Sequence, residues 1–315
     1  MNTQTEIKIP EPSIFQKVIF VTKETFSAFI DDNVLQLSAA LSYYTIFSLP
    51  PLLIIIISIT GFFFGNEAVS GELFGQINGL VGNDAAVQIQ EAIKNVTLSR
   101  SNKFATILGL TILLIGASGV FAEIQDSVNY IWGIKAKPKR GFIKFIVNRL
   151  MSFSMIGSVG FLLMVGLIIN SITDVLYNRL EVFFPREALF LFSTFNLLIV
   201  FAITTLLFTL IFKTLPDGKI AMRDCMIGAG FTSFLFMIGK FAIGAYLGSS
   251  SIATVYGAAG SLVVILLWVY YSAIILYLGA EFTKVYAHTH GQSIIPNKYS
   301  VQIDKTLPEL RQMRS

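Results

Sequence analysis

Charged residues are scarce in this chain. They make up 13% of its 315 residues, against about 25% in soluble domains, while hydrophobic residues make up 54%. The mean hydropathy is +0.70. This number of charged residues cannot cover the surface of a soluble protein of this size. The excess apolar residues therefore need lipid. The composition predicts a membrane protein and excludes a soluble enzyme, a fibrous repeat and a disordered chain.

Cysteine and histidine are also nearly absent. The single cysteine, Cys225, excludes an internal disulfide and a multi-cysteine zinc site. His288 and His290 follow the last apolar segment, where they are either a metal-binding pair or an ordinary interfacial pair at a helix end. No partner cluster accompanies them, and the phosphate-loop, zinc-protease and serine-hydrolase motifs are missing. We therefore expect no metal site, no cofactor and no enzymatic activity.

Long apolar segments dominate what is present. There are six, at residues 35–64, 104–121, 150–170, 189–212, 226–247 and 255–280. Since a helix needs about 20 mostly apolar residues to cross a bilayer, each is near or above the required length. The sequence predicts an all-α, polytopic membrane protein with six transmembrane helices.

The distribution of lysine and arginine predicts the orientation. Of the 23 basic residues, 17 fall in the two termini and the alternate loops that share their side, and 5 fall in the other loops. The basic side of a membrane protein faces the cytoplasm. Both termini are then cytoplasmic, with an arm at 1–32, a membrane domain at 33–287 and a loosely ordered tail at 288–315. The net charge of +4 fits loops that face anionic lipid better than it fits nucleic-acid binding.

Two segments outside the expected spans have helical periodicity. Residues 11–30 place apolar side chains at helical spacing among charges, which is typical of an interfacial amphipathic helix or of a helix packed on the bundle. The largest outside loop, 66–103, has the same periodicity twice. It predicts two short helices that cap the outer face, and it is the candidate contact for envelope proteins.

The first apolar segment has a polar half. Residues 33–48 include Ser42, Tyr43 and Tyr44, and Pro50 and Pro51 separate them from the purely apolar remainder. We expect a kink at the prolines. The polar side chains serve either interhelical hydrogen bonds or the wall of a cavity.

Four charged or amide side chains lie near the expected inner surface. Glu123, Asp126 and Asn129 follow the second span at three-residue spacing, which puts them on one helical face. They are either paired with nearby basic residues or form a polar gate at the inner mouth of a cavity. Glu281 ends the sixth span, and Lys284, three residues on, is placed to neutralise it.

Lys240 is the one basic residue well inside a span. A charge there costs at least about 2.5–3.5 kcal/mol on insertion scales unless it is paired or reaches the interface. It either extends to the outer surface, pairs with Asp174, or contacts an anionic substrate. Small residues such as Gly228, Gly230 and Gly239 mark the places where helices should touch.

Several separated motifs resemble those of the YihY/virulence factor BrkB family. They are Ser38–Thr45 with Ser48-Leu49-Pro50, Asp126–Trp132 (with Ser-Val in place of the usual pair of an A-L-N-x-I-W element), Leu215-Pro216 with Gly228-Ala229, Tyr256–Ser261, Leu267–Tyr270 and Leu278–Glu281. The resemblance covers about residues 26–287 and implies a bacterial inner-membrane protein with six spans. The family's old label, ribonuclease BN, conflicts with this chain, because a metal-dependent nuclease needs several His and Asp ligands.

The sequence favours a membrane transport protein that moves or gates an amphipathic, lipid-like or anionic envelope substrate. The alternative is a structural or regulatory component that docks envelope machinery through residues 66–103. The expected partners are membrane lipids and not nucleic acids, and the oligomeric state stays open.

Overall fold

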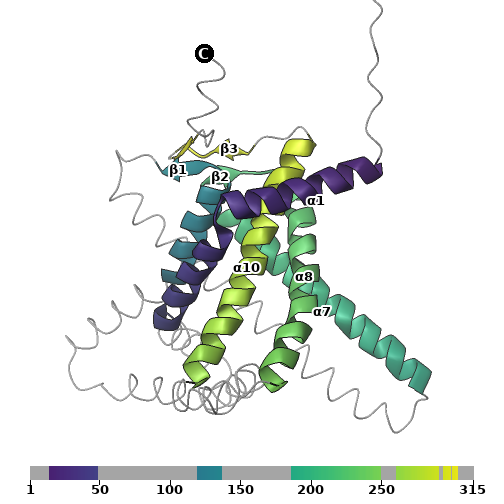
Figure 1. Ribbon diagram of the computed structural model, residues 1–315. Coiled ribbons are helices and arrows are strands. Elements are labelled where there is room, and N and C mark those ends of the chain that lie inside the picture. The colour runs from purple at the N-terminus through teal and green to yellow at the C-terminus, as the bar shows by residue number, and fades with distance from the viewer. Residues whose placement is uncertain are drawn as a thin grey trace, which may run out of the picture.

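The computed structural model describes residues 14–48, 119–136, 186–249, 260–290, 294–298 and 300–303. Most of these residues are helical. Three long helices, α7 (Arg186–Thr214), α8 (Met222–Ser249) and α10 (Gly260–Thr289), form an antiparallel bundle in which α8 packs against both α7 and α10 (Figure 1). Residues 34–48 and 119–131 are also helical. The predicted helices at 189–212, 226–247 and 255–280 are thus present, with the last one ending nine residues later than expected.

Two of these helices are long and apolar enough to cross a bilayer. Within the described residues they are Thr194–Thr214, with a mean hydropathy of 2.5, and Val263–Thr289, with 2.2. Only 22% and 39% of their apolar windows are buried inside the protein, so both helices keep apolar surface that the rest of the protein does not fully cover. That surface is stable in lipid and unfavourable in water. The six-span topology remains a prediction, because residues 49–118 and 137–185 lie outside the described residues.

Helix α1 (Ile14–Asp31) lies across one end of the bundle and packs on α10 (Figure 1). Val21 and Thr25 are buried on the side that faces the bundle. A second side exposes Phe15 (73%), Phe26 (56%) and Ile30 (71%). The structure shows that α1 packs on the bundle, as one of the two alternatives predicted, and the interfacial alternative for its exposed apolar side stays a prediction.

The same end of the molecule carries the strands, and we call it the strand-bearing end. β1 (Ile134–Ala136) pairs antiparallel with β4 (Ser300–Gln302), and β2 (Gly218–Lys219) pairs antiparallel with β3 (Ile295–Pro296). The expectation of a purely α-helical fold with a loosely ordered tail is therefore wrong for residues 294–303. Ile294, which is 1% exposed and belongs to the hydrophobic core, anchors this part of the tail.

The contact between α8 and α10 depends on glycine. A Cβ at Gly228 would collide with Thr283, and a Cβ at Gly279 would collide with Thr232. The two threonines donate their hydroxyl protons to the carbonyls of Gly279 and Gly228 on their own helices, at 2.7 Å each. This reciprocal fit confirms Gly228 as a helix contact. Gly230 is not one, because a Cβ there would meet nothing within 4 Å.

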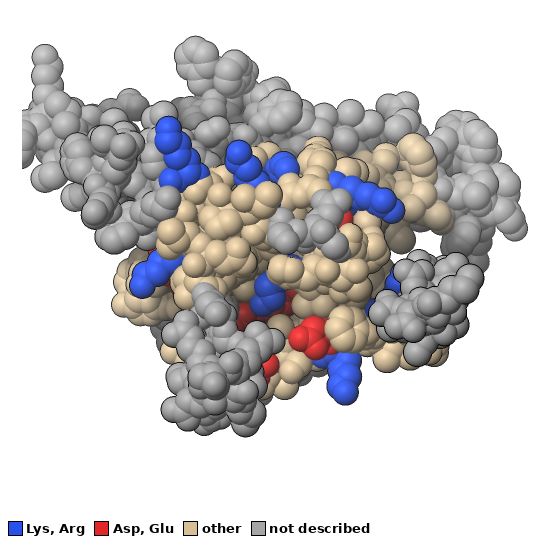
Figure 2. Space-filling model, turned by 90° about the horizontal axis from the view of Figure 1, so that it is seen from above, with Lys and Arg blue, Asp and Glu red and all other residues tan. Residues whose placement is uncertain are grey.

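Basic side chains are spread over the strand-bearing end, and few acidic ones reach its surface (Figure 2). The exposed ones within the described residues include Lys17, Lys23, Lys135, Lys219, Arg223 and Lys298. Such a face suits the anionic surface of a cytoplasmic leaflet. The orientation in the membrane stays a prediction.

Candidate functional site

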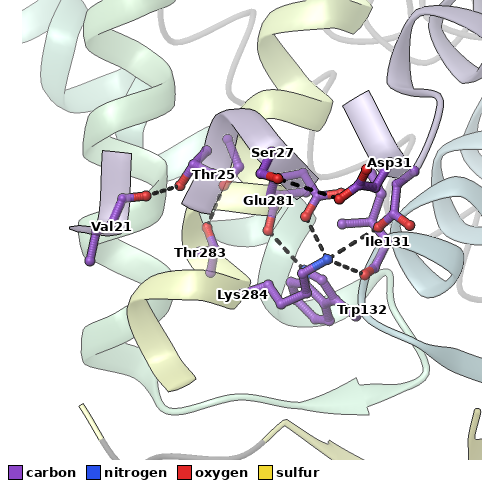
Figure 3. Close-up of polar contacts among 12 residues, drawn as sticks. Val21, Thr25, Ser27, Asp31, Ile131, Trp132, Glu281, Thr283 and Lys284 are labelled. Carbon is purple, nitrogen blue, oxygen red and sulfur yellow. Dashed lines mark hydrogen bonds and ion pairs between the residues drawn. The ribbon is translucent and has the colours of Figure 1, made fainter. Parts of the chain in front are cut away.

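A buried ionic cluster joins three segments at the strand-bearing end (Figure 3). The ammonium of Lys284 on α10 lies 2.6 Å from Glu281 Oε2 and 3.2 Å from Asp32 Oδ2, and it donates a hydrogen bond of 2.9 Å to the carbonyl of Ile131. We call Asp32, Glu281, Lys284 and the Ile131 carbonyl the Lys284 cluster. The pairing of Glu281 with Lys284 is confirmed, whereas Asp32 and Ile131 were not predicted.

Two turns in left-handed backbone place the cluster's partners. Asn33, with φ of 51°, follows the end of α1. Its backbone carbonyl accepts hydrogen bonds from the N–H groups of Gln36 and Leu37 in the first turn of the next helix. Gly133, with φ of 67°, ends the helix at 119–131. Both are helix C-terminal positions that favour Asn or Gly. As a result, Asp32 and the Ile131 carbonyl both reach Lys284 on α10.

Trp132 adds a second link between the same elements. Its indole N–H donates a hydrogen bond of 3.1 Å to the carbonyl of Ala280, and the side chain is 2% exposed. Ala280 directly precedes Glu281, so the tryptophan binds α10 next to the buried carboxyl group. The family-like motif around Trp132 thus has a structural role that its sequence did not reveal.

Asn129 forms a separate clamp with Asp217, in the link between α7 and β2. Its side-chain amide donates to Asp217 Oδ2 at 3.1 Å, and its Oδ1 accepts the backbone N–H of Asp217 at 2.7 Å. The carbonyl of Asp217 in turn accepts the N–H of Asn297 and the hydroxyl of Ser300 from the tail. The clamp therefore holds both α7 and the tail strands against residues 119–136.

The three residues predicted as a polar gate have different environments. Asn129 is buried in its clamp, Glu123 is half-buried and Asp126 is exposed. Burial raises the pKa of Glu123 above its ordinary value, the nearby Asp126 raises it further, and a hydrogen bond from Ser127 opposes both. The polar gate stays a prediction, and of its three residues Asn129 has a structural role in the clamp.

The polar half of the first apolar segment splits in a similar way. Ser42 is buried and donates its hydroxyl proton to the Ser38 carbonyl one turn earlier, at 2.8 Å, so it bonds its own helix instead of a neighbour. Tyr43 and Tyr44 are 60% and 47% exposed and contact each other edge to face. The predicted kink at Pro50 and Pro51 lies outside the described residues.

Lys240 is exposed on α8, and the described residues give it no ion pair. Asp174, its predicted alternative partner, lies outside them. The positions one, two and three turns before it, Phe236, Ser233 and Ala229, share its side of the helix. Ser233 and Ala229 are fully buried, and Phe236 packs edge to face on Phe208 of α7. Lys240 therefore lies on the side of α8 that faces α7.

The remaining candidates for chemistry serve packing. His288 and His290 are exposed, and the His290 ring stacks on Tyr286 at 4.1 Å between centroids. No group of three or more metal-binding side chains occurs among the described residues. Cys225 is fully buried, and that burial raises the pKa of its thiol to about 12. A thiol so rarely ionised is neither a nucleophile nor a ready metal ligand.

A family model and individual relatives both match most of this chain. Residues 25–301 match the family described as Virulence factor BrkB. The chain is 25% identical over 284 residues to a UPF0761 membrane protein of Saccharophagus degradans, covering 85% of this chain and 60% of that one. It is 27% identical to one of Alkalilimnicola ehrlichii, covering 81% and 56%, and 28% identical to one of Xanthomonas campestris pv. campestris, covering 80% and 57%. The chain thus spans less than two thirds of these relatives, and no solved structure matches it.

Proposed function

Because the chain belongs to the virulence factor BrkB family of membrane proteins, we propose that it moves or gates an anionic, lipid-like substrate in a bacterial cytoplasmic membrane. The observation that carries the proposal is the position of Lys240. A single ammonium within an apolar helix attracts a compact anion, such as the phosphate of a lipid headgroup.

The side of α8 on which Lys240 lies supports an interior role. If the lysine only extended into the lipid headgroups, it would most simply lie on the lipid-facing side of the helix. That side is marked by Phe234 and Ile238, which are 57% and 52% exposed. Lys240 is about 120° and 160° around the helix from them, at about 100° per residue. It continues instead the row of Ser233 and Phe236 toward α7.

Two buried hydroxyl groups lie on the facing sides of α7 and α8. Ser233 Oγ and Thr205 Oγ1 are buried and have no hydrogen-bond partner among the described residues. Thr205 lies one turn before Phe208, the α7 residue that contacts Phe236, and so shares its side of α7. We call Thr205, Ser233 and Lys240 the α7–α8 seam. The charged head of Lys240, with two hydroxyls along the same seam, can bind a polar headgroup, while the exposed apolar side chains of α7 and α8 accommodate acyl chains.

The test is transfer of a fluorescent anionic phospholipid between the leaflets of liposomes that contain the full chain. Lys240→Met should slow transfer about tenfold, because it removes one charge-assisted contact worth about 1.5 kcal/mol. Lys240→Arg should retain most activity, since the charge persists. Both variants should insert and unfold like the wild type, because the side chain is exposed.

Two matched controls locate the effect. Ile238→Met alters the lipid-facing side of α8 two residues away, and Lys219→Met removes an exposed charge from the strand-bearing end. Both should leave transfer unchanged. Wild-type transfer no faster than in empty liposomes, or equal transfer by Lys240→Met, would reject the proposal and favour the structural alternative.

A further inference from the structure

Tyr271 contacts α8 differently from the other side chains that pack on a glycine between α8 and α10. At Gly228 and Gly279 the space is filled by threonines whose hydroxyls already bond a carbonyl of their own helix. At Gly239 it is filled by Tyr271 of α10, whose hydroxyl oxygen is the first atom that a Cβ there would meet. Among the described residues this hydroxyl has no hydrogen-bond partner, although a tyrosine hydroxyl that packs against protein usually finds one. An acceptor is therefore missing at this contact.

Gly239 places the Tyr271 hydroxyl beside Lys240. The lysine is the next residue of α8, about 100° around the helix, so the hydroxyl lies against the backbone from which the lysine side chain leaves. Lys240 is exposed and Tyr271 is half-buried. The ammonium and the hydroxyl are both donors, and neither carries a negative charge. An anion that accepts from both would satisfy them together.

Thr205 adds a third donor from α7. In the antiparallel pair of helices, Phe208 of α7 contacts Phe236 of α8, with 5.9 Å between ring centroids. At 1.5 Å per residue, Thr205 and Lys240 lie about 4.5 Å and about 6 Å from that contact, both away from the strand-bearing end. Ser233 lies about 10 Å nearer that end than Lys240 does. Of the two hydroxyls of the α7–α8 seam, Thr205 is therefore the one level with the lysine.

These three groups lie at a depth where polar side chains need partners. Thr205 is near the centre of the apolar span Thr194–Thr214, and Tyr271 belongs to the span Val263–Thr289. A hydroxyl or an ammonium inside an apolar layer is costly unless it is hydrogen-bonded or paired. The Thr205 Oγ1 is buried and has no partner among the described residues. A bound anion would offset these costs at one place.

We propose that Thr205, Lys240 and Tyr271 bind the terminal phosphate group of a lipid, and that the Tyr271 hydroxyl makes the site prefer phosphate to carboxylate. This headgroup assignment rests on the proposed function, because it specifies what the α7–α8 seam binds. A terminal phosphate has three acceptor oxygens around a tetrahedral atom, so it can accept from three helices at once. A carboxylate has two oxygens in one plane and leaves one of the three donors without an acceptor.

The test compares two short amphiphiles, octyl phosphate and octanoate, by calorimetric titration of the full chain in lipid nanodiscs. Empty nanodiscs supply the correction for partitioning into lipid. The wild type should bind octyl phosphate more tightly than octanoate. Tyr271→Phe keeps the ring and removes the hydroxyl, so it should weaken octyl phosphate binding about tenfold, the effect of losing one hydrogen bond to a charged group. Octanoate binding should change little.

Two further variants locate the effect. Tyr270→Phe makes the same change at the neighbouring tyrosine, about 100° around α10, and should alter neither ligand. Lys240→Met should weaken both ligands, because either anion uses the positive charge. The preference between the ligands is a ratio measured on one protein, so a general loss of stability does not produce the expected pattern.

A Tyr271→Phe variant that keeps the wild-type preference would overturn the proposal, as would a Tyr270→Phe variant that loses it. Failure of the wild type to bind octyl phosphate would overturn it too. Liposome transfer of lipid is measured separately on the same proteins. The expected binding pattern without transfer would support the phosphate site and reject the transport function, whereas transfer without the pattern would reject the phosphate site alone.

Discussion

Lys284 and Lys240 lie on neighbouring helices of one bundle, yet their surroundings are opposite. Lys284 contacts two carboxyl groups and a carbonyl, and its side chain is 18% exposed. Lys240 is exposed and has no ion pair among the described residues. Lys284 stabilises the fold, because removing its charge would leave buried carboxyl groups without a cation. Lys240, which has no ion pair among the described residues, is available to bind a molecule from outside the chain.

The largest expected effect is at Lys284. Lys284→Met leaves Glu281 and Asp32 without their cation and should lower the free energy of unfolding by about 3–5 kcal/mol, the usual cost of breaking a buried pair. Thermal unfolding in detergent measures it, with Lys240→Met as the comparison and little change expected there. Adding Glu281→Gln to Lys284→Met should restore part of the loss. Equal stability of the two lysine variants would remove the distinction between these sites.

A somewhat smaller loss is expected where α8 and α10 touch. Gly228→Ala forces Thr283 to move and should cost about 3 kcal/mol, the upper part of the range for overpacking. Gly230→Ala is the matched control on the same helix turn, and it should be neutral or slightly stabilising, since alanine favours helix. Addition of Thr283→Ala, which removes the hydroxyl group that collides, should recover part of the loss. If both alanine variants unfold alike, the helices do not meet at Gly228.

The smallest of the three effects is expected at the clamp. Asn129→Ala removes two hydrogen bonds to Asp217, worth about 1 kcal/mol each, so the loss should be about 2 kcal/mol. Asn129→Asp should be at least as harmful, because a carboxylate cannot donate to Asp217 and repels it. The same unfolding assay, with limited proteolysis of the tail, measures both. A loss no greater than that of Asp126→Asn, at an exposed position, would show that the clamp contributes little.

Among the described residues, hydropathy predicted the long helices well, because a long apolar segment is a local property of composition. The bounds of α7 and α8 differ from the apolar segments by only a few residues, and the Glu281–Lys284 pair follows from spacing on one helix. The sequence also placed α1 correctly as an amphipathic helix. These features are local, so one stretch of sequence is sufficient to define them.

The missed features all join distant parts of the chain. Asp32 reaches Lys284 across 252 positions, and Asn129 reaches Asp217 across 88. No periodicity within one segment specifies such partners. The polar signal at Asn129 was seen without its partner, although the quoted Leu215-Pro216 motif directly precedes Asp217. The tail strands were missed because their polar composition resembles that of a loose extension. The burial of Ile294 and the hydrogen bonds from Asn297 and Ser300 to Asp217 fix them.

The pairing of β1 with β4 also sets an order of assembly. Ile134–Ala136 leaves the ribosome long before Ser300–Gln302, and α7, α8 and α10 are all synthesised between them. Until synthesis ends, β1 has an open edge, which readily pairs with other chains. A chain that stops before residue 300 keeps that edge open, so a truncated product differs from a finished one on its surface. Of the strands that the structure describes, the last to be made therefore covers an edge of the first.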